Sequence, residues 1–360
     1  MTSHSLPLSV IVSVSDSGST LREVLAAIRA TELPHDSYEL IVVDDASADG
    51  SVGTAARYAD TVVRLSGRSA GPAYARNRGV EVARGEVIAF VGADVVVRPE
   101  TLPRMLAMLV KRPEIDAVSA SRDERCGAPN FISQYWNLLL RFGEHHHSGS
   151  AQFASGCGAV RRDAFLSAGM YDEWRFDTAC LESVELGERL FGAGLGVLLS
   201  SDLQVTHLKR WNLYTVCQEV WRRSRLLARS LGYSRMSAAA PSEVVFTLSR
   251  ALIPAAALLG TLMLAAAFVP PPSAAVKAGV ALIVLLLTNL PVHRFYARSR
   301  GLGFAIVSAP LHVFVQIVTL VALCAGWILR DVFGDVSPDA TTQAYSELGL
   351  DIWPPVPRRL

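Results

Sequence analysis

The sequence has almost no net charge and few cysteines. Its 34 Lys and Arg residues against 33 Asp and Glu residues leave a formal net charge of +1. We therefore expect no nucleic acid partner, and any basic function must be local. The five cysteines form no CxxC pair and no zinc spacing, which predicts reduced thiols rather than a disulfide framework. A basic segment before the first apolar run is also missing, so we expect no signal peptide.

Charged side chains become scarce beyond about residue 243. Three long apolar runs follow, at about 247–269, 273–292 and 304–329. A helix of roughly 20 apolar residues crosses a bilayer, so the runs predict an α-helical membrane domain at 244–330 with three spans. A buried, all-helical core is the alternative. Pro310 and His312, within the third run, also leave a re-entrant segment open.

Basic residues predict how this domain sits in the membrane. The loop after the second run carries three arginines, so the positive-inside rule places it in the cytoplasm. Residues 1–210 are then expected on the cytoplasmic side of a multi-pass cell-membrane protein, with the tail at 331–360 outside. Residues 211–243, which connect the soluble part to the membrane domain, combine arginines and tryptophans at helical spacing. This pattern favours an amphipathic helix in contact with membrane lipids, and packing on the soluble part is the alternative.

The first 121 residues alternate strand-like and helix-like segments. Apolar runs such as "LSVIVSV" and "YELIVVDD" alternate with amphipathic segments such as 19–30, where Thr20 and Glu23 fit a capping box. Repeating βα units predict an α/β fold, with a Rossmann-like, mostly parallel sheet covered by helices on both faces. Ligands bind such sheets beyond the carboxyl ends of the strands. That edge is predicted to collect Asp44, Asp45 and Asp94.

Four motifs occur in an order and spacing that are more specific than any one of them. They are "SVIVSV", "VVDDASADGS", "GPAYARNRGVEVARGEVIAFVGADVVV" and "LESVELGERL" followed by "VTH". Together they resemble the inverting family-2 glycosyltransferases, over roughly residues 6 to 235. The resemblance implies a catalytic domain of the GT-A fold at 1–210, which transfers a sugar from a nucleotide-sugar donor.

The resemblance also assigns residues to the donor. In the family's pattern Asp45 accepts hydrogen bonds from the nucleotide base, which is a charge-assisted contact. The alternative is that Asp45 only caps a turn, where Asp is favoured. Arg76 either offsets pyrophosphate charge or lies on a solvated helix face. The implied donor residues are Ser13, Asp44, Asp45, Ser47, Arg76 and Asn77.

The metal motif departs from the family's pattern. A D-x-D motif is common at this strand end, and here it reads Gly92-Ala93-Asp94. The resemblance leaves Asp94 to reach Mg²⁺ or Mn²⁺, with diphosphate oxygens and water as further ligands. His207 matches a position beside the diphosphate, where an imidazole ligand favours Mn²⁺. A satisfied strand-end histidine is the alternative.

The position of the general base departs as well. Relatives carry a Glu-Asp pair where this chain has Glu182 and Ser183. A serine hydroxyl cannot deprotonate an acceptor, because its pKa is far too high. Three readings stay open: Glu182 or Glu185 substitutes, the acceptor is an already anionic polyprenyl phosphate, or the chain has lost catalysis.

A glycine-rich segment, "SGCGAVRR", matches the acceptor side of the family. Glycines there would let the backbone approach the sugar. The implied acceptor-side residues are Gly156, Gly158, Arg161 and Trp211. The sequence therefore predicts a membrane-bound hexosyltransferase that builds a cell-envelope polysaccharide or glycolipid on a lipid-linked acceptor. A non-catalytic, nucleotide-sugar-binding membrane protein of the same fold is the alternative.

Overall fold

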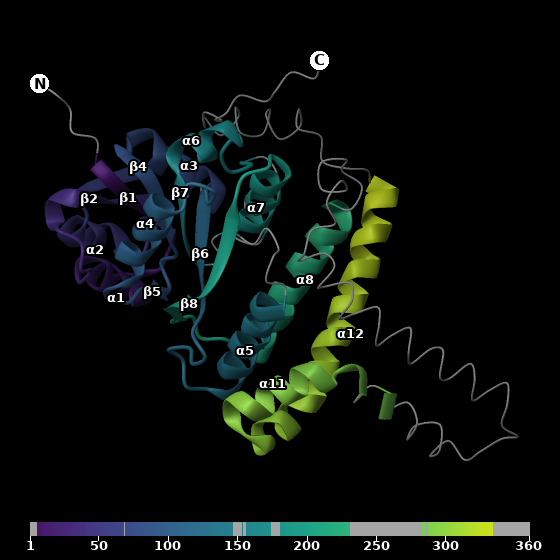
Figure 1. The fold of residues 1–360 in the computed structure, drawn as a ribbon. Helices are drawn as coiled ribbons and strands as arrows, with labels where there is room; N and C mark the ends of the chain where they lie inside the picture. Colours follow the sequence, from purple (N-terminus) through teal and green to yellow (C-terminus); the bar gives the residue numbers. More distant parts are fainter. Residues whose placement is uncertain are drawn as a thin grey trace, which may run out of the picture. The chain divides into compact units, whose positions relative to one another are not determined.

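The computed structural model of the chain describes residues 6–67, 69–146, 153, 156–173, 181–230, 283–284 and 287–333 (Figure 1). These residues form two compact units. The first contains the described residues up to 137 and from 144 to 210, and the second contains 138–143 and those from 211 on. The first predicted span, most of the second and nearly all of the tail lie outside the described residues.

The first unit is built on an eight-stranded sheet with the order β3-β2-β1-β4-β7-β6-β8-β5. Strands β3, β2, β1 and β4 run parallel, and so do β6 and β8. Strand β7 lies antiparallel between β4 and β6, and β5 is antiparallel to β8. The predicted α/β class with a mostly parallel sheet is confirmed. The strands are β1 (Leu6–Val14), β2 (Tyr38–Asp45), β3 (Thr61–Leu65), β4 (Gly85–Val91), β5 (Val95–Val96), β6 (Ala117–Arg122), β7 (Cys157–Arg161) and β8 (Val197–His207).

Helices cover both faces of the sheet. Helices α1 and α4 share a core with Val10 and Val12 of β1, whereas α3 packs on Ile11 and Val43 of the opposite face. Gly79 makes the second contact possible, because a Cβ at this position would lie 2.7 Å from Ile11 Cγ2. The helices of this part of the chain are α1 (Gly18–Arg29), α2 (Ser51–Tyr58), α3 (Pro72–Val82), α4 (Thr101–Lys111), α5 (Phe131–His146), α6 (Arg162–Ser167) and α7 (Glu182–Gly192), with a 3₁₀ turn at His35–Ser37.

Helix α1 begins earlier than its predicted capping box. Ser17 is the N-cap, and its carbonyl accepts hydrogen bonds from the backbone N–H groups of Thr20 and Leu21, both at 3.0 Å. The capping box of Thr20 and Glu23 is therefore wrong, because Thr20 already lies inside the helix. The hydroxyl of Thr20 instead donates to the carbonyl of Ala93 at 2.7 Å. The predicted apolar face is confirmed, with Leu21, Val24, Leu25 and Ile28 all buried.

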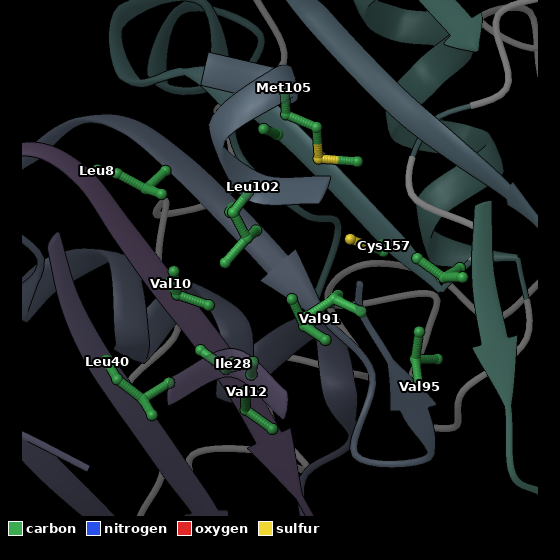
Figure 2. Close-up of a cluster of buried hydrophobic side chains, with 14 of the residues drawn as sticks. Leu8, Val10, Val12, Ile28, Leu40, Val91, Val95, Leu102, Met105 and Cys157 are labelled. Atoms are coloured by element: carbon green, nitrogen blue, oxygen red, sulfur yellow. The ribbon is translucent and has the colours of Figure 1, made fainter. Parts of the chain in front are cut away.

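An aliphatic core lies between the sheet and helices α1 and α4 (Figure 2). Leu8, Val10 and Val12 alternate along β1 onto this side, and Ile28 of α1 and Met105 of α4 belong to the same cluster. Burying each such side chain contributes about 1.5–3 kcal/mol. Strand β2 is buried at all eight positions, as expected of a parallel strand covered on both faces. The core thus fixes the strand ends on which the acidic side chains lie.

The second unit is helical. Helix α8 (Leu213–Ser230) packs along the long helix α12 (Leu302–Phe333), which is yellow in Figure 1, and α11 (Leu290–Arg300) packs on α12 as well. The backbones of α8 and α12 come close, since a Cβ on Gly326 would lie 2.8 Å from the carbonyl oxygen of Arg225. A helix is therefore present over Leu213–Ser230 of the region predicted to be amphipathic, and it packs on α12 within this unit. Residues 231–243 of that region lie outside the described residues.

Helix α12 has polar side chains on its inner face and apolar ones on its outer face. His312 and Gln316 are buried and hydrogen-bond to Asn289 Oδ1, at 3.1 and 2.6 Å. The exposed side chains are Leu302, Ile306, Val307, Phe314, Ile317, Val321, Trp327 and Ile328. Within the described residues, Leu302–Leu329 is the one helix long and apolar enough to cross a membrane. Of the three predicted spans, the third therefore has a candidate helix among the described residues.

Candidate functional site

The ends of β2 and β4 flank β1 at the carboxyl edge of the sheet. Val14, the last residue of β1, pairs with Asp44 in the parallel ladder. On the other side, β4 pairs with β1 as far as Phe90, and the Gly92-Ala93-Asp94 turn follows. The topology thus brings Asp44, Asp45 and the turn to one edge, where open α/β sheets bind ligands.

The carboxylate of Asp45 is buried and already occupied. Its Oδ1 accepts a hydrogen bond from the N–H of Ala70 at 2.9 Å. Its Oδ2 accepts from the N–H of Gly71 at 2.9 Å and from the Ser69 hydroxyl at 2.6 Å. Asp45 therefore holds the loop that leads into α3. A structural role of this kind is the alternative to a contact with the nucleotide base.

Asp44 has more capacity for a ligand. It is buried, and among the described residues its Oδ1 accepts a single long hydrogen bond, 3.3 Å, from the N–H of Ser47. The hydroxyl of Ser47 accepts from the N–H of Asp16 at 3.1 Å, so Ser47 belongs to the loop framework. Ser13 is half-buried in β1, one residue before Val14. Of the predicted donor acids, Asp44 is thus the better placed to receive an N–H of a nucleotide base.

The β1–α1 connection is tied to the β2–α2 connection beside it. Asp16 Oδ1 accepts from the N–H of Ala48 at 2.8 Å, and the N–H of Gly18 donates to Asp49 Oδ2 at 2.8 Å. Asp49 also accepts hydrogen bonds from Ser51, which lower the pKa of its carboxyl. Asp16 has a φ of 47°, a left-handed conformation that a non-glycine residue adopts at a cost of about 1–2 kcal/mol. These hydrogen bonds hold the loop after β1 and the loop after β2 together.

Arg76 is paired with the candidate base. Its Nη1 donates to Glu182 Oε1 at 2.9 Å, and its guanidinium carbon lies 5.3 Å from the centre of the Tyr171 ring. Burial acts to lower the pKa of Arg76, but Tyr171 and Glu182 outweigh burial, so the pKa is raised. The neighbouring Asn77 is buried, and its Nδ2 donates to the Tyr171 carbonyl at 3.0 Å and to Glu173 Oε1 at 2.7 Å. Both residues thus hold the chain near Tyr171.

Glu182, Ser183 and Glu185 lie buried in the first turn of α7. Both oxygens of Glu185 accept hydrogen bonds from Arg189, at 2.6 and 2.8 Å. Each candidate base is therefore held by an arginine. Burial raises the pKa of Tyr171 to about 12, partly offset by Arg76 and by the nearby hydroxyl of Ser183. Tyr171 is consequently a neutral phenol beside Ser183.

Three hydrogen bonds from three parts of the chain hold the turn that carries Asp94. They run from Thr20 Oγ1 to the Ala93 carbonyl at 2.7 Å, from the Leu208 N–H to the Asp94 carbonyl at 2.8 Å, and from the Gly92 N–H to the Gly156 carbonyl at 2.8 Å. Space at Gly92 is tight, because a Cβ there would lie 3.1 Å from Asp94 Oδ1. The glycine in place of the first acid thus leaves the Asp94 carboxylate unobstructed.

His207 lies beside this turn. The β5–β8 ladder pairs it with Val95, the residue after Asp94. Its ring rests on Gly156, where a Cβ would come within 2.5 Å of His207 Cε1. Burial, and then the charges of Arg122 and Lys209, lower the pKa of His207 well below its usual value. The imidazole is therefore neutral near pH 7, which is the form that binds metals.

A carboxylate in the turn and a neutral imidazole on the strand paired beside it suit a cation that takes most of its ligands from elsewhere. Mg²⁺ and Mn²⁺ at nucleotide sites use diphosphate oxygens and water in this way. Among the described residues, no group of three or more His, Cys, Asp and Glu side chains is placed to hold a metal. The residues present thus fit a shared protein–diphosphate site rather than a metal site built by the protein alone.

The predicted acceptor-side residues of the first unit lie at different points along and before β7. Gly156 is at the site, against His207. Because β7 runs antiparallel, Gly158 lies within the sheet opposite Phe90, and Arg161 lies at the far end of the strand. The guanidinium of Arg161 donates to the carbonyls of Ile115 and Leu109, away from the edge at which the sequence predicted it. Trp211 belongs to the second compact unit.

Sequence reasoning missed two contributors to this site. Asp16 braces the loops after β1 and β2, and Tyr171 lies between Arg76 and Ser183. Neither residue belongs to a motif in the linear pattern, since both act through partners that are distant in sequence. A turn-favouring "SDSG" between a strand and a helix was the one available signal for Asp16.

Comparison with known proteins agrees with this geometry. A family model, glycosyl transferase family 2, matches residues 9–168. The chain is 33% identical over 119 residues to the uncharacterized glycosyltransferase YibD of Escherichia coli (strain K12), which covers 32% of this chain and 34% of YibD. It is 30% identical over 172 residues to the undecaprenyl-phosphate 4-deoxy-4-formamido-L-arabinose transferase of Pseudomonas fluorescens (strain Pf0-1), covering 44% and 49% of the two chains. These matches span about half or less of each relative.

A solved structure resembles more of the chain. The mannosyltransferase PcManGT from Pyrobaculum calidifontis, in complex with GDP-Man and Mn²⁺, superposes with a TM-score of 0.59 at 20% identity, covering 84% of this chain and 87% of that one. At this identity the likeness shows the fold. Residues 9–168 therefore match the glycosyl transferase family 2 model within a domain of the GT-A fold, and helices that include a long apolar one follow it.

Proposed function

We propose that the protein is a divalent-metal-dependent glycosyltransferase that moves a hexose from a nucleotide-sugar donor to a lipid-linked acceptor, with inversion. The observation that carries the proposal is the placement of Asp44, Asp94 and His207 at the carboxyl edge of a GT-A sheet. PcManGT, which has a similar fold, was solved with GDP-Man and Mn²⁺, and this supports a nucleotide-sugar donor and Mn²⁺ or Mg²⁺ here.

The residues at this edge divide the work of holding the donor. Asp44 accepts an N–H of the base, and Asp45 fixes the adjoining loop through Ser69, Ala70 and Gly71. Asp94 and His207 would hold the cation. When bound, such a cation neutralises charge that develops on a diphosphate leaving group.

Activation of the acceptor is the unusual part of the site. A sugar hydroxyl needs a positioned base, which contributes typically about 10²–10⁴-fold in rate. Here Glu182 and Glu185 are engaged by arginines, and Ser183 replaces the family's base. A phosphate monoester is already anionic near pH 7, because its second pKa is about 6. The relative from P. fluorescens is named for undecaprenyl phosphate, which supports a polyprenyl phosphate acceptor over a hydroxyl glycolipid.

A lipid-linked acceptor places the enzyme at a membrane. The outer face of α12 is apolar while its polar residues point inward, an arrangement suited to lipid rather than water. Our proposal retains three spans in the cell membrane, with residues 1–210 on the cytoplasmic side. Products of such an enzyme would be precursors of a cell-envelope polysaccharide or glycolipid.

The direct test uses the purified full chain in detergent. UDP- and GDP-sugars are screened by thermal shift with Mn²⁺ or with EDTA, and the donor that binds is then offered with a polyprenyl phosphate or a hydroxyl glycolipid. We expect cation-dependent binding of one donor and transfer to the polyprenyl phosphate. Binding without transfer to either acceptor would instead support the non-catalytic alternative.

A further inference from the structure

The first turn of α1 touches both halves of the proposed donor site. The N–H of Gly18 donates to Asp49 Oδ2 at 2.8 Å, in the loop that follows Asp44 and Asp45. Two residues later, the hydroxyl of Thr20 donates to the Ala93 carbonyl at 2.7 Å, in the turn that carries Asp94. One rigid helix start therefore bridges the loop after β2 and the turn after β4.

The Thr20 hydroxyl serves this turn rather than its own helix. A hydroxyl has one proton to donate. Its oxygen lies 2.7 Å from the Ala93 carbonyl oxygen but 3.3 Å from that of Ser17, so the shorter bond goes to Ala93. The Ala93 carbonyl and the Asp94 N–H belong to one planar peptide unit. Fixing that carbonyl therefore fixes the direction in which the backbone enters Asp94.

Side chains hold this turn at one point in the part of the chain that the structure describes. The bonds of Gly92 to Gly156 and of Leu208 to Asp94 are backbone to backbone. Thr20 is the side chain that bonds the backbone of residues 92–94. With Gly92 in place of a second acid, the direction of the Asp94 carboxylate depends on this turn.

We propose that Thr20 is a positioning residue that sets the Asp94 carboxylate relative to the nucleotide-binding loop. The inference rests on the proposed function, in which Asp94 holds the cation. Thr20 touches neither donor nor cation in this scheme. Loss of its hydroxyl should reduce the gain in nucleotide affinity that a cation provides, and should leave the cation-free affinity unchanged.

The test is titration calorimetry of the full chain with UDP and with GDP, each in Mn²⁺ and in EDTA. For Thr20→Val we expect the affinity gain from Mn²⁺ to fall by about 3–10-fold, which is the range that one neutral hydrogen bond supports. Thr20→Ser keeps the hydroxyl and should restore the gain. In an Asp94→Asn background, Thr20→Val should have no further effect.

Thr31→Val is a matched control. Thr31 lies just after the other end of α1, and its hydroxyl also donates to a backbone carbonyl, that of Pro99, at 3.1 Å. This substitution should leave the Mn²⁺ gain unchanged. If Thr20→Val does not fold, Thr20→Ala is compared with Thr20→Ser in the same titrations.

Two failures are distinguishable. A Thr20→Val protein that keeps the wild-type gain, or that loses affinity equally in EDTA, overturns the role of Thr20 and leaves the proposed function standing. A wild-type protein with no Mn²⁺ gain for either nucleotide overturns metal-dependent donor binding and the role of Thr20 with it.

Discussion

Arg76 and Glu182 form an ion pair at 2.9 Å between α3 and the first turn of α7, although 106 positions separate them in the sequence. Their side chains are only 16% and 7% exposed. One was expected to face the pyrophosphate and the other to act as a base toward the acceptor. The pair links α3 to α7, with the Tyr171 ring against the guanidinium.

Arg76→Met should destabilise the fold strongly. Removing one partner of a buried ion pair leaves the other charge uncompensated and costs about 3–5 kcal/mol. We expect a drop of about 3 kcal/mol in the free energy of unfolding, measured with urea. Arg112→Met removes the partner of Glu114 from an exposed pair and should have no measurable effect. Equal effects of the two substitutions would contradict this account.

Substitutions of Asp44 and of Asp45 should affect different properties, nucleotide binding for the first and stability for the second. Asp45→Ala leaves buried N–H groups of Ala70 and Gly71 without their acceptor, at about 1–3 kcal/mol each. We therefore expect a loss of at least about 2 kcal/mol in unfolding free energy. Asp44→Asn should leave stability unchanged and weaken nucleotide binding about 10-fold or more. Thermal unfolding measures the stability of both variants, and calorimetry measures their nucleotide affinity. If Asp45→Ala weakened binding and Asp44→Asn lowered stability, the contact with the base would be assigned to Asp45.

Gly156→Ala should disturb the metal side of the site. Its Cβ would fall 2.5 Å from His207 Cε1, so the ring has to move. We expect the Mn²⁺ gain in nucleotide affinity to be largely lost while the EDTA affinity persists. Gly53→Ala is the control, because a Cβ there meets nothing within 4 Å and a helical Gly→Ala change is neutral or stabilising. An unchanged Mn²⁺ gain in Gly156→Ala would exclude His207 as a ligand.

The acceptor can be identified through Glu182. If the acceptor is a polyprenyl phosphate, no base is required. Glu182→Gln also removes the partner of Arg76, so rates are compared per folded protein. Transfer should then stay within about 10-fold of wild type, since base removal costs typically about 10²–10⁴-fold. The measurement compares initial rates of wild type and Glu182→Gln with polyprenyl phosphate and with hydroxyl glycolipid acceptors. Activity on hydroxyl acceptors alone, abolished by Glu182→Gln, would assign the base to Glu182 and exclude the phosphate acceptor.

Membrane topology is testable by cysteine labelling in spheroplasts. Single cysteines at Ser299, in α11, and at Ser346, in the tail outside the described residues, should label from opposite sides if α12 crosses the bilayer. A cysteine-free background removes the five native thiols. Labelling of both from one side would show that α12 lies in or re-enters the membrane surface.

Much of the fold was predictable because it is local. Uninterrupted apolar strands and the spacing of Leu21, Val24 and Leu25 predicted β1, β2, β4 and α1 with their correct faces. Strand β7 was missed, since its five residues carry no alternation and its antiparallel place between β4 and β6 depends on distant partners. Because β7 was not predicted, the position of Arg161 was not predicted either: the antiparallel strand places this residue at the end far from Gly156.

The site was predictable in its members but not in their pairing. Motifs brought Asp45, Arg76 and Glu182 to attention, yet the bonds of Asp45 to the β3–α3 loop and of Arg76 to Glu182 join residues 24 or more positions apart. Side-chain partners at such separations follow from the packed sheet. Sequence periodicity carries no information about them.

The insertion of β7 has a consequence for the order in which the chain can complete its site during synthesis. Strands β1 to β4 can pair once the first 91 residues have emerged from the ribosome. The turn at Asp94, however, needs the carbonyl of Gly156 and the N–H of Leu208. A nascent or truncated chain can therefore hold half of the sheet with its β4 edge bare, and donor binding should mature only after about residue 208 has joined the fold.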